Sequence, residues 1–292
     1  METSVLGLEA MRPLHTPAHR LPDGSQRIYC YHIRKTGGTS LHRSFLGLGG
    51  EDPAVVERRL SSSFLRRTSS GDYVYAVNLR RVLEQGKYFY GWSHLPAHTL
   101  QLPPGTFTVS ILRDPVRRVE SYYNYMLTGD APGTAFTVPD VERRRARNGF
   151  HGLLDSLPRE VLLRQLFMFS ADFDVSEAVE RASQCSMLFF NEDYDRGLAE
   201  LSRRLQLPLE VRHDRAGGTK AALSSDELDR LRTLLEPEYQ LIEQLRDSRQ
   251  RWLDANTEPN GDSATLVDPP EQHESAPPRS DDAARPGAAQ PD

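Results

Sequence analysis

The sequence is poor in cysteine and has no long hydrophobic run. Its 292 residues include two cysteines, Cys30 and Cys185, which excludes a disulfide-rich secreted scaffold. One disulfide between them would satisfy this count, but the apolar surroundings of Cys30 favour two buried, reduced thiols. No segment has the continuous apolar length of a signal-peptide core or a transmembrane helix. From these absences we expect a cytoplasmic protein with no integral membrane segment.

The C-terminal segment, residues 254–292, lacks aromatic residues altogether. It holds seven prolines, nine acidic residues and two basic ones, and cannot bury enough apolar surface to offset the entropy of ordering the chain. We therefore predict a disordered, acidic, proline-rich tail over residues 254–292, a flexible segment over residues 1–25, and one folded domain over residues 26–253. The whole chain carries a net charge of −5; because the tail contributes −7, the rest carries +2, which suits an anionic ligand.

Short apolar runs alternate with helical patterns along the predicted domain. Runs typical of buried strands occur at residues 27–33, 87–92, 106–112 and 186–190. Apolar residues spaced for one helix face occur at residues 39–46, 115–126, 198–205 and 224–245. This alternation predicts an α/β fold: a single domain with a P-loop-like, mostly parallel sheet and helices on both faces. Ligands of such sheets bind at the carboxyl ends of the strands, so residues that follow a strand are candidates for function.

Residue types mark the starts of two of these helices. Asp114 is a suitable N-cap, and Pro115 favours the first helical position. Ser224 and Glu227 have the spacing of a capping box. Pro237 predicts a kink in the helix that follows.

The first candidate site follows the predicted strand 27–33. Residues 32–40 read His-Ile-Arg-Lys-Thr-Gly-Gly-Thr-Ser, with adjacent glycines that let backbone N–H groups at a helix start approach an oxygen-rich anion. The residues that we expect to form this phosphate-type site are Lys35, Thr36, Gly37, Gly38, Thr39 and Ser40. The loop differs from a Walker A motif, in which the lysine follows the glycines. An ordinary glycine-rich turn is the alternative interpretation.

The second candidate site follows the predicted strand 106–112. Arg113 ends this strand, and Ser121 lies two helical turns after Asp114, on roughly the same helix face. An arginine fork together with a hydroxyl group is a good second phosphate clamp. The alternative is a plain helix start with an arginine at the surface.

The third candidate is His94, which follows the predicted strand 87–92 and is expected at the same sheet edge as Lys35. A histidine there can accept a proton from an attacking hydroxyl group, a task worth about 10²–10⁴-fold in rate. The alternative is a structural histidine held by hydrogen bonds. We expect His42, on the helix after the first loop, to be structural or at the surface.

Together these clusters make the sequence resemble the carbohydrate-type sulfotransferases, the broad group that includes the heparan sulfate 2-O- and 6-O-sulfotransferases and many bacterial relatives. The first signature of that group reads approximately His-Ile-Pro-Lys-Thr-Gly-Gly-Thr-Ser, and residues 32–40 match it with Arg34 in place of proline. The second reads Leu-Arg-Asp-Pro, followed by Ser-Tyr-Tyr, as in residues 112–123. A Gly-His-Leu-Pro segment usually lies between them; here two residues separate Gly91 from His94. The resemblance covers roughly residues 27–250.

The resemblance implies an enzyme that transfers a sulfuryl group from 3′-phosphoadenosine-5′-phosphosulfate (PAPS) to a hydroxyl group. Residues 35–40 would bind the 5′-phosphosulfate, with Lys35 also contributing to catalysis. Arg113 and Ser121 would bind the 3′-phosphate, and His94 would be the catalytic base. A late loop of the group would place three residues over the nucleotide, although a plain turn is equally compatible with them. These residues are Gly218, Thr219 and Lys220.

The expected acceptor is carbohydrate-like or a small molecule, including a sugar or a glycolipid. We expect no metal requirement and no nucleic-acid partner, and the sequence leaves the oligomeric state open. The basic residues 143–147 either touch an anionic acceptor or form a solvated face. Two other functions remain as alternatives: a P-loop kinase that uses ATP and magnesium, and a nucleotide-binding protein that has lost catalysis.

Overall fold

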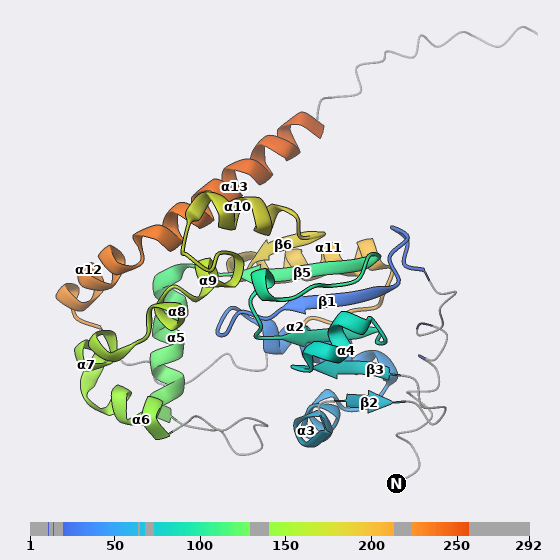
Figure 1. The fold of residues 1–292 in the computed structure, drawn as a ribbon, viewed down its shortest axis with the longest axis horizontal. Coiled ribbons are helices and arrows are strands. Elements are labelled where there is room, and N and C mark those ends of the chain that lie inside the picture. The colour runs from blue at the N-terminus through green and yellow to red at the C-terminus, as the bar shows by residue number, and fades with distance from the viewer. Residues whose placement is uncertain are drawn as a thin grey trace, which may run out of the picture.

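A six-stranded sheet forms the centre of the molecule (Figure 1). The computed structural model describes residues 11, 14, 20–63, 65–67, 73–128, 140–212 and 223–256. The strands lie in the order β2-β3-β4-β1-β5-β6, and all neighbours are parallel except β2 and β3. The strands are β1 (Arg27–Tyr31), β2 (Leu65–Arg67), β3 (Tyr73–Val77), β4 (Tyr90–Ser93), β5 (Thr106–Leu112) and β6 (Met187–Phe190).

The helices cover both faces of the sheet and extend beyond its carboxyl edge (Figure 1). They are α2 (Gly38–Leu46), α3 (Pro53–Ser63), α4 (Arg80–Gln85), α5 (Pro115–Thr128), α6 (Asp140–Arg147), α7 (Gly149–Ser156), α8 (Arg159–Leu162), α9 (Arg164–Phe169), α10 (Val175–Ser183), α11 (Tyr194–Leu205), α12 (Ser225–Leu234) and α13 (Glu236–Asn256). The predicted single α/β domain with a mostly parallel sheet is thus confirmed. No helix in the described part of the chain is long and apolar enough to cross a membrane.

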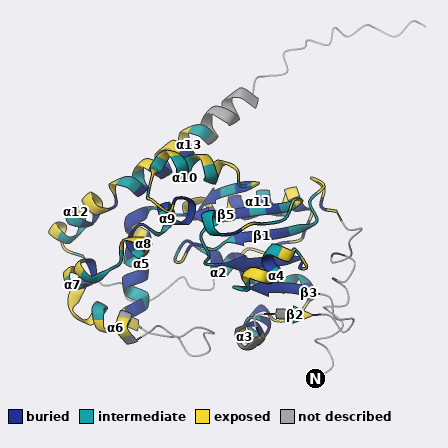
Figure 2. Ribbon diagram, in the orientation of Figure 1, coloured by how far each residue is buried: buried dark blue, intermediate teal, exposed yellow. Residues whose placement is uncertain are grey.

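Alternate residues of the central strand β1 face different cores, as the two-residue period of a strand requires. Ile28 packs with Phe45 of α2, and the same core takes in α3 and α11. Tyr29 faces the other side and packs with Leu83 of α4. A third core joins α5, α7, α9, α10, α12 and α13 beyond the end of β5. Figure 2 shows the result: β1 is buried, whereas α6, α7 and α12 carry exposed outer faces.

Local patterns predict several of these elements well. β5 has the predicted bounds, and α5 begins at Pro115 after the cap formed by Asp114, whose Oδ1 accepts the Arg117 N–H at 2.8 Å. Ser224 and Glu227 form the predicted capping box at the start of α12. The helical pattern then breaks between α12 and α13, two residues before Pro237.

Several features of the structure can be compared with the remaining predictions. The strands β2 and β3 were not predicted, although residues 73–77 read Tyr-Val-Tyr-Ala-Val, a run typical of a strand. Cys30 is buried and Cys185 is half-buried, and both are free thiols, as favoured above. Leu21, within the segment predicted to be flexible, is buried in the core. Residues 257–292, most of the predicted tail, lie outside the described residues.

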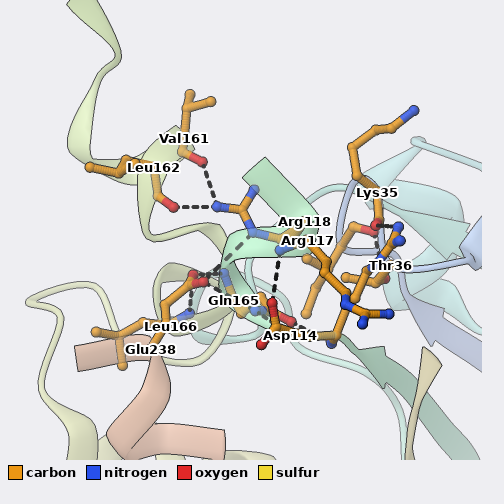
Figure 3. A network of polar contacts seen from close by, with 12 residues as sticks. Lys35, Thr36, Asp114, Arg117, Arg118, Val161, Leu162, Gln165, Leu166 and Glu238 are labelled. Carbon is orange, nitrogen blue, oxygen red and sulfur yellow. Dashed lines mark hydrogen bonds and ion pairs between the residues drawn. The ribbon is translucent and has the colours of Figure 1, made fainter. Parts of the chain in front are cut away.

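A buried carboxylate on α13 connects three helices (Figure 3). Glu238 is fully buried, and its Oε1 accepts the backbone N–H groups of Gln165 at 2.6 Å and Leu166 at 3.3 Å. These N–H groups belong to the first turn of α9, where they have no partner within the helix. The other oxygen, Oε2, lies 3.1 Å from Nε2 of Gln165 and 3.6 Å from Nε of the buried Arg118. Glu238 therefore caps the start of α9 and balances the charge of Arg118 on α5.

We expect the Glu238→Gln variant to lose about 3–5 kcal/mol of unfolding free energy, because it leaves the Arg118 guanidinium buried without a counter-charge. Urea denaturation monitored by circular dichroism measures this loss. The matched control is Glu236→Gln, at an exposed position of the same helix, which should change stability by less than about 0.5 kcal/mol. Equal stability of the two variants would contradict the central role of Glu238.

Candidate functional site

The three sequence-predicted clusters meet at the carboxyl edge of the sheet. Nη1 of Arg113, after β5, donates to the carbonyl oxygen of Lys35, after β1, at 3.1 Å. Nδ1 of His94, after β4, lies 2.8 Å from the carbonyl oxygen of His32, which also follows β1. The loop after β1 thus lies between the other two clusters and makes a hydrogen bond with each.

The loop after β1 ends in a helix start that has no side-chain cap. α2 begins at Gly38, and Gly37 precedes it with φ at 104°, a conformation that favours glycine. The first backbone N–H groups of a helix have no partner within it and carry the positive end of the helix dipole, so they suit an anion. Thr39 and Ser40 lie half-buried in this first turn. The structure therefore shows the strand–loop–helix arrangement on which the predicted phosphate-type site depends.

Close packing explains why both glycines are needed. A Cβ atom on Gly38 would lie 2.2 Å from the His32 ring. A Cβ atom on Gly37 would lie 2.5 Å from the amide nitrogen of Asn191, which follows β6. Asn191 was not among the predicted site residues, although its position directly after the strand predicted at residues 186–190 could have identified it.

The other two residues of the loop have different roles. Lys35 adopts a positive φ of 72°, and its Nζ lies 4.4 Å from the ring centroid of Tyr125 on α5. Figure 3 shows its side chain extending away from the Glu238 network. Thr36 is buried, and its hydroxyl group donates to the carbonyl oxygen of Ile33 at 2.9 Å. The Thr36 side chain therefore stabilises the loop.

Arg113 is held from behind by a single amide side chain. Gln165 accepts the Arg113 backbone N–H at 2.8 Å and donates to the Arg113 carbonyl oxygen at 2.9 Å. Burial lowers the pKa of Arg113, yet a guanidinium group stays charged in proteins. Its Nε has no hydrogen-bond partner among the described residues. Ser121 lies one helical turn before Tyr125, so it shares the α5 face over which Lys35 lies.

His94 is held in one tautomer by the backbone. Because Nδ1 donates to the His32 carbonyl oxygen, Nε2 carries the lone pair in the neutral ring. Burial lowers the pKa of His94 to about 4, and the positive charge of Arg34 adds to this effect. The His94 carbonyl oxygen accepts Nη2 of Arg164 at 2.6 Å, so a second cation lies beside the ring. At neutral pH this histidine is an uncharged proton acceptor.

Two more histidines extend this arrangement into the core. Nε2 of His42 lies 2.8 Å from Nδ1 of His32, and Nδ1 of His42 lies 2.7 Å from the Tyr90 hydroxyl oxygen. The His42 ring is buried and stacks on Trp92 with centroids 4.4 Å apart. Burial lowers the pKa of His42 well below its ordinary value. Of the two expectations for His42, the structural role is confirmed and the surface position is wrong.

The remaining predicted residues lie apart from this edge or outside the described chain. Gly218, Thr219 and Lys220 lie outside the described residues. The basic residues 143–147 belong to α6, which packs on α5 and α7. None of them lines the pocket that borders His94. Across the described ranges, no three His, Cys, Asp or Glu side chains are placed to hold a metal ion.

Comparison with protein-family models and with curated proteins finds no match to this chain. The assignment of a function therefore depends on the residues and geometry of the carboxyl edge.

The pKa of His94 makes stability depend on pH in a predictable direction. Between about pH 4 and pH 6.5 the unfolded chain binds a proton at this histidine and the folded chain does not, so stability falls on acidification. We expect the His94→Asn variant, whose amide can still donate to the His32 carbonyl oxygen, to lose about 2 kcal/mol less than the parent between pH 7 and pH 5. Urea denaturation at the two pH values measures this; an unchanged difference would contradict the burial of a neutral ring.

Proposed function

We propose that this protein transfers a sulfuryl group from PAPS to a hydroxyl group of a carbohydrate-like or small-molecule acceptor. The observation that carries this proposal is the convergence of a glycine-rich helix start, Lys35 and Arg113 beside a neutral histidine, His94. The donor has two separate anionic groups, so it needs two clamps. We assign one to the loop of Lys35 and the other to Arg113, whose Nη1 donates to the Lys35 carbonyl oxygen. A cytoplasmic location fits the two free thiols and belongs to the same proposal.

The charges and hydrogen-bond donors of the site suit the anionic groups of the donor. The start of α2 and the Lys35 ammonium group would hold the 5′-phosphosulfate, because backbone N–H groups and a point charge both suit a tetrahedral anion. Arg113 and Ser121 would hold the 3′-phosphate, with the Arg113 backbone fixed by Gln165. The Nε of Arg113 has no hydrogen-bond partner among the described residues, so this guanidinium group has a donor that the protein does not use.

The donor supplies a sulfur atom that the acceptor hydroxyl oxygen attacks in line with the bridging oxygen of the 5′-phosphate. His94 would accept the hydroxyl proton at Nε2 as the new oxygen–sulfur bond forms and the bond from sulfur to the bridging oxygen breaks. Lys35 and the N–H groups of α2 would stabilise the negative charge that the leaving phosphate gains. The products are a sulfate ester and adenosine 3′,5′-bisphosphate, and His94 then returns its proton to water.

We expect adenosine 3′,5′-bisphosphate to stabilise the protein without added metal. At 100 times its dissociation constant the gain is about 2.7 kcal/mol, or roughly 5–10 °C in melting temperature. Differential scanning fluorimetry with EDTA measures this shift, which should shrink in Lys35→Ala and persist in the exposed control Lys87→Ala. Stabilisation by ATP with magnesium instead would contradict the proposal and favour the P-loop kinase.

A variant of His94 tests its role as the proposed base. We expect His94→Ala to lower kcat by about 10²–10⁴-fold while binding of the bisphosphate survives, because the ring acts on the acceptor proton. Transfer of labelled sulfate to a fractionated extract, followed by mass spectrometry, measures the activity. The exposed His151→Ala is the matched control and should retain full turnover. Tight bisphosphate binding without transfer to any acceptor would favour the catalytically inactive alternative.

A further inference from the structure

A small pocket borders His94. Its volume is about 210 Å³, and its lining residues are Arg34, His94, Arg118, Tyr122, Val161 and Arg164. None of the residues predicted to bind the donor lines it, whereas the proposed base does. The pocket is therefore placed to hold whatever lies next to the hydroxyl group that loses its proton.

The lining of the pocket is strongly cationic. Three of its six residues are arginines, and none is acidic. The charge of Arg118 is already balanced by Glu238. No carboxylate in the described part of the chain forms an ion pair with Arg34 or Arg164. The pocket thus presents two positive charges that form no ion pair within the described ranges.

Burial and neighbouring positive charges both disfavour the charged form of Arg164. Burial lowers its pKa to about 10, and the charges of Arg34 and Arg118 add to this effect, while Glu160 opposes it. One nitrogen, Nη2, donates to the His94 carbonyl oxygen, but Nε is buried and has no hydrogen-bond partner among the described residues. A buried donor without a partner is unfavourable, and an oxyanion within reach of it would supply that partner.

We propose that this pocket binds an anionic group of the acceptor, a carboxylate or a phosphate, between Arg34 and Arg164. The inference rests on the proposed sulfuryl transfer and specifies its substrate class: a hydroxyl compound that already carries a negative charge. Arg34 occupies the position at which the related signature has proline, so this charge is a property of the present chain.

The size of the pocket limits what enters it. Sites for drug-sized ligands usually measure about 300–1,000 Å³, so a pocket of about 210 Å³ suits a single charged ring or a shorter hydroxy acid. Tyr122 offers an aromatic surface on which the apolar face of such a ring can pack. The remainder of a larger acceptor would lie outside the pocket.

Nuclear magnetic resonance of the arginine side chains tests the binding directly, without any transfer reaction. In the ¹⁵N-labelled full chain, the Arg164 Nε–H signal is assigned by its absence from Arg164→Lys. At constant ionic strength, glucuronate or glucose 6-phosphate should shift this signal, and glucose should not. A shift with only one of the two anions identifies carboxylate or phosphate as the group. No shift with either anion, or the same shift with glucose, would overturn the proposal.

Arg34→Gln then tests the second arginine. Because Arg34 is exposed, its replacement should leave the fold intact, and the dissociation constant of the active anion should rise about tenfold. The control Arg203→Gln, on the exposed face of α11, should leave it unchanged. In a transfer assay Arg34→Gln should raise the KM for the anionic acceptor about tenfold. Anion binding without transfer to any acceptor would contradict the proposed sulfuryl transfer and support the anion pocket. Transfer with an unchanged KM in Arg34→Gln would support the sulfuryl transfer and contradict the anion pocket.

Discussion

The site depends on one buried carboxylate that lies far from it in sequence. Glu238 accepts the N–H groups that begin α9 and faces the Arg118 guanidinium of α5, both in the core. Gln165, held by Glu238, in turn fixes the backbone of Arg113 on both sides. A buried charge is tolerated only with partners, so α13, α9 and α5 must dock together. Docking of the C-terminal helices is thus a condition for positioning Arg113.

The sequence predicts the parts of this fold that depend on local pattern. The strand that becomes β5, the cap at Asp114 and the capping box at Ser224 each depend on neighbouring residues only. The interaction of Glu238 with Gln165 spans 73 positions, and no pattern around either residue predicts it. The strand β3 was missed although its run of aromatic and β-branched residues is typical of a strand.

In the candidate site, too, some residues could be predicted from the sequence and others could not. Lys35, Arg113 and His94 could be predicted to meet because each follows a strand of a parallel sheet, and the carboxyl ends of such strands share one edge. His42 and Arg164 could not, because their roles arise from packing against the side chain of His32 and the carbonyl of His94. Thr36 matches the signature, yet only the structure assigns its hydroxyl group to the loop itself.

The charges around His94 connect acceptor binding with proton transfer in the proposed reaction. Burial and the positive charge of Arg34 keep the pKa of His94 near 4, which makes it a weak base. A bound anion between Arg34 and Arg164 would offset their repulsion of a proton and raise this pKa toward its ordinary value. A stronger base accepts the hydroxyl proton more readily. The group that positions an anionic acceptor would therefore also activate His94, so a neutral compound of the same shape would be discriminated against in both binding and proton transfer.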